Sequence, residues 1–78
     1  MKIEIITPDT TIFTGEASLV QFPGLDGSFE ILNNHAPLIA ALQKGRIKVL
    51  GMDKLPMFFE IKGGVVEVAR NKILVLAE

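Results

Sequence analysis

Apolar and polar residues alternate along much of the chain with a period of two. The alternation is clearest over residues 2–5, 46–49 and 59–62. Successive side chains of a strand point to opposite faces, so this pattern predicts strands with one buried and one wet face. Residues 73–77 are instead apolar at every position. That segment indicates a strand in the interior of a sandwich, or one that lies against a partner.

Residues that favour turns interrupt the pattern at short intervals, and few windows leave the roughly 11 unbroken residues of a three-turn helix. β-branched residues and Phe fill the segments between the breaks, as is typical of strands. The window 36–44 has helix propensity from Ala and Leu, but Pro37 near its start and Gly45 at its end favour a strand. Strands are therefore predicted at residues 1–7, 11–16, 17–23, 28–32, 36–42, 45–50, 56–62, 64–69 and 72–77.

About nine short strands in a chain of 78 residues predict two small sheets packed face to face, or a flattened barrel. The connections are too short for crossovers, so successive strands should mostly be antiparallel neighbours. No linker, repeat or low-complexity segment divides the sequence. We therefore expect a single all-β domain over residues 1–78.

The composition argues against several classes of protein. The chain has 8 Lys and Arg against 9 Asp and Glu, which argues against a strongly basic nucleic-acid binder. It has no Cys, so a disulfide framework and a thiolate metal site are excluded. No apolar run approaches the ~20 residues that span a bilayer, so we expect no direct membrane insertion. The first residues resemble neither a signal peptide nor a transit peptide, which favours a cytoplasmic location.

The sequence also shows no set of side chains that would form a catalytic site. His35 is the single histidine, and neither Ser18 nor Ser28 lies in a Gly-x-Ser-x-Gly elbow. One His without Cys makes a zinc site improbable, and the acids fall mostly on the wet positions of strands. We therefore expect no catalytic residue, no metal and no cofactor. A lone His of this kind is more often a structural residue than a ligand.

Several apolar residues occupy the side of their strands that should face water. Such residues can fill a second core layer, or they can form a docking patch on the surface. With no catalytic constellation, the second possibility points to a binding or assembly module. These residues are Ile6, Leu19, Phe58, Val65 and either Leu74 or Val75.

A series of motifs is more specific. Taken in order, the motifs are Pro8-Asp9, Phe13-x-Gly15-Glu16-Ala17, Phe22-Pro23-Gly24-Leu25-Asp26-Gly27, Ile31-Leu32, His35-Ala36-Pro37-Leu38, Gly45-x-Ile47-x-Val49, Gly63-Gly64-Val65-Val66-Glu67-Val68, Asn71-x-Ile73 and Val75-Leu76-Ala77. Over nearly the whole chain this series resembles the epsilon-subunit family of the F-type ATP synthase, in its N-terminal β-sandwich domain. Each motif alone is weak, and the combination is specific.

The resemblance implies a flattened sandwich or barrel of ten strands in two five-stranded, mainly antiparallel sheets. It implies a non-catalytic rotor subunit of the central stalk. Such a subunit binds the gamma subunit and the ring of c subunits, and it reaches the alpha/beta catalytic head indirectly. Proton-driven rotation of the ring is thereby coupled to ATP synthesis. The expected location is the cytoplasmic face of a bacterial cell membrane, as a peripheral protein.

The resemblance also implies two contact sets. The family's ring-facing loop matches Asp26, Gly27, Ser28 and Phe29. Its gamma-facing surface matches Thr7, His35, Ala36 and Ala40.

The chain departs from the family pattern in three places. Asn33-Asn34 stands where the family has Pro-Gly, and Asn tolerates the left-handed conformation that such a turn needs. Glu30 stands where the family has Gly; at a positive φ it would cost about 1 kcal/mol, and otherwise it only adds a charge. The family typically continues into a two-helix hairpin, which has no counterpart after Glu78. We therefore expect no ATP binding and no helix-mediated inhibition by this chain.

Two other classes fit the size and the strand pattern. A lipoyl- or biotinyl-type carrier domain would need a modified Lys at a hairpin tip, and residues 51–55 could place Lys54 there. The flanks that such a lysine usually has are missing. An oligonucleotide-binding barrel is disfavoured by the charge balance and by the absence of Trp and Tyr.

Overall fold

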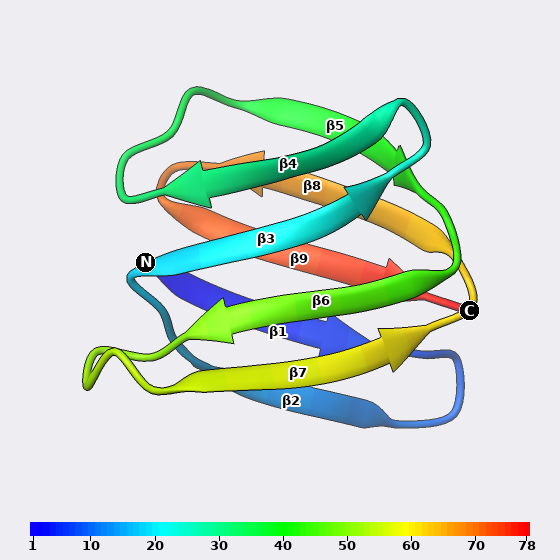
Figure 1. Cartoon of the computed structure of the whole chain (residues 1–78), viewed down its shortest axis with the longest axis horizontal. Helices are drawn as coiled ribbons and strands as arrows, with labels where there is room; N and C mark the ends of the chain where they lie inside the picture. The colour runs from blue at the N-terminus through cyan, green and yellow to red at the C-terminus, as the bar shows by residue number, and fades with distance from the viewer.

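The computed structural model describes all residues 1–78, and it contains nine strands and no helix (Figure 1). Each strand begins and ends within about two residues of its predicted bounds. The window 36–44 forms a strand, because Leu38–Leu42 pairs along its length with a neighbour. The strands are β1 (Lys2–Ile6), β2 (Thr11–Glu16), β3 (Leu19–Gly24), β4 (Gly27–Leu32), β5 (Leu38–Leu42), β6 (Gly45–Leu50), β7 (Pro56–Ile61), β8 (Gly64–Ala69) and β9 (Lys72–Ala77).

Two layers make up the fold. Sheet I has the order β2-β1-β9-β8-β5, and sheet II has the order β4-β3-β6-β7. The backbone ladder passes from one sheet to the other through a single residue pair, Gly24 with Leu42. The expected all-β sandwich is confirmed, whereas the strand count is corrected from ten to nine, since sheet II has four strands rather than five.

Four hairpins supply most of the pairing, namely β1–β2, β3–β4, β6–β7 and β8–β9, and all four are antiparallel as predicted. The first and last strands form the one parallel pair, with Lys2 opposite Lys72 and Ile6 opposite Leu76. This pairing brings the first and last strands side by side in the middle of sheet I, with the two chain ends at opposite ends of the sandwich (Figure 1).

The core lies between the sheets and is made by the inward residues of the alternating strands. Ile3, Ile5 and Phe22 are fully buried, and Phe22 stacks on Phe29 with ring centroids 5.5 Å apart. At the edge where β2 faces β7, Phe13 and Phe59 close the gap between the layers at 5.0 Å. Polar side chains are absent from the buried set, so close packing of apolar side chains holds the layers together.

Three residues of the β4–β5 and β8–β9 connections adopt the left-handed conformation. Asn34 has φ 63°, and Arg70 and Asn71 have φ 54° and 60° in the two-residue turn between β8 and β9. Positive φ at both central residues defines a type I′ turn, whose twist matches that of the strands it joins. Asn34 therefore fills its turn as the sequence indicates. Glu30 has no positive φ, so it adds an outward charge without backbone strain.

Candidate protein-docking surface

An apolar row crosses the outer face of sheet I. Strand register places Ala41, Val65, Leu76 and Ile6 side by side on β5, β8, β9 and β1. Val65 and Leu76 are 40% and 49% exposed. Their strand neighbours Val66, Val75 and Ala77 point inward and are buried, so the outward residues are surplus to the core. A row of this kind on a wet sheet face is typical of a protein contact.

The row belongs to a larger apolar area, which we call the sheet I patch. Ile39 on β5 is 72% exposed, and Ile12 on β2 is 38% exposed at the irregularity between β1 and β2. The sheet I patch consists of Ile6, Ile12, Ile39, Ala41, Val65, Leu74 and Leu76.

The residues predicted to face gamma border this patch at both of its ends. Thr7 lines a shallow hollow with Ile6 and Leu76 where β1 ends. His35 and Ala36 are exposed in the loop that leads into β5, at the opposite end of the sandwich. Thr7 and His35 therefore do not form one cluster. Ala40 is half-buried and packs against the core, so it offers less surface than the other three.

The residues predicted to face the ring lie on the β3–β4 hairpin. Asp26, Gly27 and Ser28 are exposed, and Gly27 has φ 125°, a conformation that favours glycine. Phe29 is half-buried, because its ring stacks on Phe22 in the core. The tip also presents Leu25, which is 61% exposed and is not among the residues predicted to face the ring.

The β3–β4 turn is fastened to sheet I at the bridge between the layers. The Leu25 N–H donates to the Ala41 carbonyl at 3.1 Å, and the Gln43 N–H donates to the Pro23 carbonyl at 2.8 Å. The Gln43 side-chain amide also donates to the Gly24 carbonyl at 2.8 Å. The tip is therefore held in place by bonds to both sheets.

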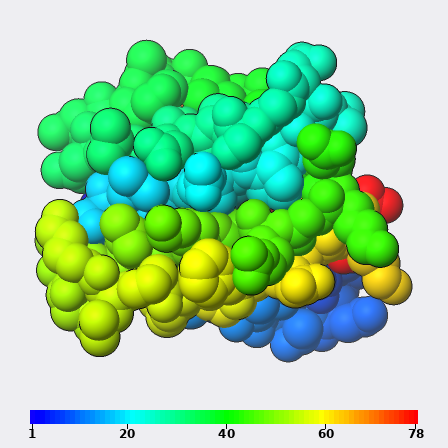
Figure 2. Space-filling view, viewed as in Figure 1, coloured from blue at the N-terminus to red at the C-terminus, as the bar shows by residue number.

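The outer face of sheet II carries a second apolar row. Figure 2 shows this face, over β4, β3, β6 and β7. Register aligns Leu32, Leu19, Leu50 and Pro56 across the four strands, and Leu32 is 55% exposed. Phe58 is 50% exposed one row along, with the Arg46 guanidinium 4.8 Å above its ring centre.

The outward apolar residues predicted from the sequence thus divide between two faces. Ile6, Val65 and Leu74 lie on sheet I, and Leu19 and Phe58 lie on sheet II. Val75 is fully buried, so Leu74 is the outward member of that pair. Sheet membership depends on long-range pairing, which the sequence pattern does not give.

The structure holds no group of three or more His, Cys, Asp or Glu side chains that could bind a metal ion. It also holds no helix long and apolar enough to cross a membrane. Lys54 lies at the tip of the β6–β7 hairpin with φ 66°, the position that a carrier domain would require.

Comparison with known proteins distinguishes a carrier domain from the epsilon-subunit family of the ATP synthase. A family model described as ATP synthase, Delta/Epsilon chain, beta-sandwich domain matches residues 1–78. The ATP synthase epsilon chain of Chlorobium limicola is 46% identical over 77 residues, which cover 99% of this chain and 88% of that protein. The epsilon chain of Chlorobaculum tepidum is 42% identical over 76 residues, covering 97% and 86%. That of Sulfurimonas denitrificans is 42% identical over 78 residues, covering 100% and 60%.

Solved structures show the same fold. A chain of the Euglena gracilis mitochondrial ATP synthase, in a structure of its OSCP/F1/c-ring part, superposes with a TM-score of 0.90 at 17% identity over 96% of this chain and 48% of that one. A chain of the central stalk/c-ring structure of the Tetrahymena thermophila mitochondrial ATP synthase gives 0.78 at 21% identity, over 99% of this chain and 62% of that one. At these identities the likeness concerns the fold alone.

Proposed function

Because the chain belongs to the ATP synthase delta/epsilon chain β-sandwich family, we propose that it is the adaptor between the gamma subunit and the c-ring. It is a non-catalytic subunit of the ATP synthase. In this proposal gamma packs on the sheet I patch, and the ring of c subunits meets the β3–β4 turn. Rotation of the proton-driven ring then reaches gamma and, through gamma, the alpha/beta head. The complex would hold the chain at the cytoplasmic face of a bacterial membrane as a peripheral subunit.

The apolar row of sheet I is the observation that supports the gamma contact. Burial of apolar surface contributes about 25 cal/mol per Å², and a partner laid across the row would cover side chains from four adjacent strands. The row lies between Thr7 at one end and the His35 loop at the other, which are the positions that match the family's gamma-facing surface.

The β3–β4 turn supports the ring contact by its chemistry and its position. It is a protruding polar tip with one exposed apolar side chain, Leu25, and its backbone is fastened to both sheets. A polar tip of fixed shape suits a polar loop of a partner, because it loses little conformational entropy on binding.

Substitution on the two faces tests the gamma contact. Leu76→Asp places a charge in the middle of the sheet I patch, and we expect it to weaken binding to purified gamma by about thirtyfold or more. Leu32→Asp is the matched control, since Leu32 is exposed to a similar extent, 55% against 49%, on sheet II. It should bind gamma like the unsubstituted chain. Circular dichroism melting checks that both variants fold. Equal loss in both variants, or loss in Leu32→Asp alone, contradicts the assignment of gamma to sheet I.

Cysteine cross-linking tests the ring contact, because the chain has no Cys of its own. Asp26→Cys lies on the β3–β4 turn, and Asp53→Cys lies at the opposite end in the β6–β7 turn. In the assembled complex, a cysteine in the polar loop of the c subunit should form a disulfide with the first variant and not with the second. If Asp53→Cys forms the disulfide and Asp26→Cys does not, the ring contacts the opposite end of the sandwich and the proposal is wrong.

A further inference from the structure

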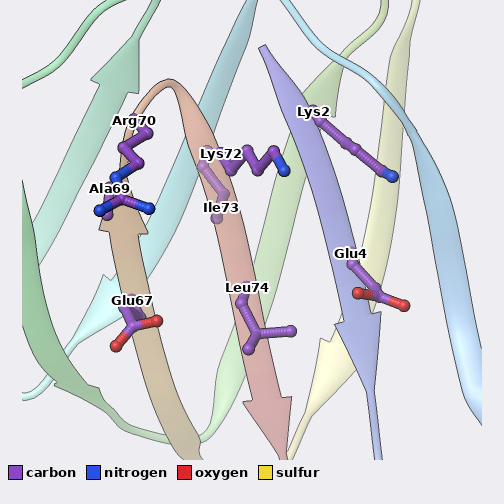
Figure 3. Close-up of a pocket in the computed structure, with 8 residues that line it drawn as sticks. All are labelled: Lys2, Glu4, Glu67, Ala69, Arg70, Lys72, Ile73 and Leu74. Atoms are coloured by element: carbon purple, nitrogen blue, oxygen red, sulfur yellow. The ribbon is translucent and has the colours of Figure 1, made fainter.

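Three cations gather at the end of sheet I opposite the β3–β4 turn. Lys2 and Lys72 are direct register partners on β1 and β9, and Arg70 lies in the turn before β9. Figure 3 shows Lys72 extended across the space between β9 and β1, with Arg70 over the end of β8. The three side chains line a shallow pocket of about 440 Å³. We call them the basic corner.

No carboxylate of this chain pairs with the basic corner. The one ion pair in the structure joins the Met1 ammonium to Glu16 at 3.7 Å. Glu16 is the register partner of Lys2 on β2. Its carboxylate instead pairs with the chain terminus, and Glu4 and Glu67, which line the same pocket, form no ion pair with the corner.

Two features of the basic corner lower the stability of the fold. Like charges directly opposite each other on neighbouring strands destabilise a sheet, and Lys2 faces Lys72 in this way. Arg70 has φ 54°, in a turn position that Asn, Asp or Gly fills more easily. A sequence shaped by stability alone would avoid both features, and local strain of this kind gathers at functional sites.

From these observations we infer that the basic corner receives an acidic segment of the gamma subunit, one that presents at least two carboxylates. The inference rests on the proposed function and deepens it. The corner is continuous with the sheet I patch, since Lys72 and Leu74 are successive outward residues of β9 and Leu76 is the next. A partner that covers the patch therefore reaches the corner.

Nearby carboxylates restrict where the acidic segment can lie. Glu67 and Glu4 flank Leu74 in the neighbouring row, and they repel an acid placed there (Figure 3). An acidic segment is thus directed onto the lysine row, which fixes the register of the partner along the strands. The corner lies at the opposite end from the β3–β4 turn, so a ring or membrane surface at that turn would not reach it (Figure 1).

Charge reversal tests this inference on the full chain. We compare Arg70→Glu/Lys72→Glu with Lys48→Glu/Lys54→Glu, which changes the net charge equally but on the β6–β7 hairpin of sheet II. At about 50 mM salt the first variant should bind gamma about tenfold more weakly, through a lower association rate, and the second should bind within about twofold of the unsubstituted chain. At about 500 mM salt the difference should largely vanish, because salt screens exposed charges.

The outcomes separate this inference from the proposed function. If gamma binds the unsubstituted chain and both double variants equally, the basic corner has no acidic partner on gamma, whereas the proposed function stands. If gamma does not bind the unsubstituted chain, both fail. If Arg70→Glu/Lys72→Glu loses only binding to vesicles of anionic lipid, the corner serves a membrane surface and the inference is wrong. Arg70→Asn gives a second readout, since it should raise the melting temperature and still weaken gamma binding.

Discussion

The backbone N–H of Asn34 donates to the Oδ1 of Asn71 at 2.7 Å, across 37 residues of sequence. The bond ties the β4–β5 loop to the β8–β9 turn, and both residues are in the left-handed conformation. It therefore positions the loop that carries His35 next to the turn that carries Arg70.

Asn71→Ala should lower the free energy of unfolding by about 2 kcal/mol. About 1 kcal/mol comes from the lost hydrogen bond and a similar amount from alanine at a φ of 60°. Asn71→Asp keeps the acceptor and tolerates the same conformation, so it should stay close to the unsubstituted chain. Urea denaturation measures both. Equal loss in the two variants would show that the side-chain bond contributes nothing.

Gly64→Ala should destabilise the fold much more than Gly27→Ala. Both glycines have a positive φ, 148° and 125°. A Cβ at Gly64 would overlap the Leu76 carbonyl oxygen and lie 3.0 Å from the Ala77 Cα, whereas a Cβ at Gly27 meets nothing within 4 Å. We expect about 3 kcal/mol or more at Gly64 and about 1 kcal/mol at Gly27. Thermal unfolding of the two variants provides the comparison, and similar losses would contradict the steric argument.

Phe13 and Phe59 should be energetically coupled across the open edge of the sandwich. Their rings are 5.0 Å apart and tilted by 36°. A double-mutant cycle with Phe13→Leu and Phe59→Leu should give a coupling of about 1 kcal/mol. Phe58 is the control, because it precedes Phe59 on β7 and points to the outer face of sheet II. A cycle between Phe13 and Phe58 should give a coupling near zero.

Extension of the chain before Met1 should lower stability. The Met1 ammonium donates to the Ala17 carbonyl at 3.0 Å and to the Asn33 Oδ1 at 3.3 Å, and the residue is buried. Two added residues turn the ammonium into an amide with one N–H, which loses a charge-assisted bond, and we expect a loss of about 2 kcal/mol. The same two residues added after Glu78, which is exposed, should have little effect. Melting temperatures of the two extended chains test this difference.

Local pattern predicted the strands well, because alternation and turn chemistry are local properties. Glycine and asparagine marked the turns, and the wet and buried faces followed from the period of two. The helix propensity of residues 36–44 did not prevail, since β5 pairs with β8 and its Leu42 reaches the core. The tenth strand expected from the family resemblance is absent from this chain.

Outward apolar residues of the patch were predicted from the sequence, but which of them share a face, and the corner itself, could not be predicted, because both depend on long-range strand pairing such as that of β1 with β9. Lys44, Arg46 and Lys48 are the cations that lie close together in sequence, yet Arg46 stacks on Phe58. Lys2 and Lys72 are far apart in sequence, and register makes them neighbours. The same pairing joins Ile6 to Leu76 and so forms the apolar row.

The seam between the layers has a mechanical consequence. Only Gly24 and Leu42 are bridge partners across it, and the bonds of Leu25 and Gln43 reinforce that one point. A force applied at the β3–β4 tip is therefore transmitted to both layers at once, because backbone bonds join the tip to each layer. Away from the tip, sliding of one layer over the other is resisted by interlocked side chains and by the bonds that join Asn33 and Asn34 to Met1 and Asn71. Torsional stiffness should accordingly be greatest at the end that bears the tip, where backbone pairs join the layers, and lower at the end that bears Arg70, where only side-chain bonds join them.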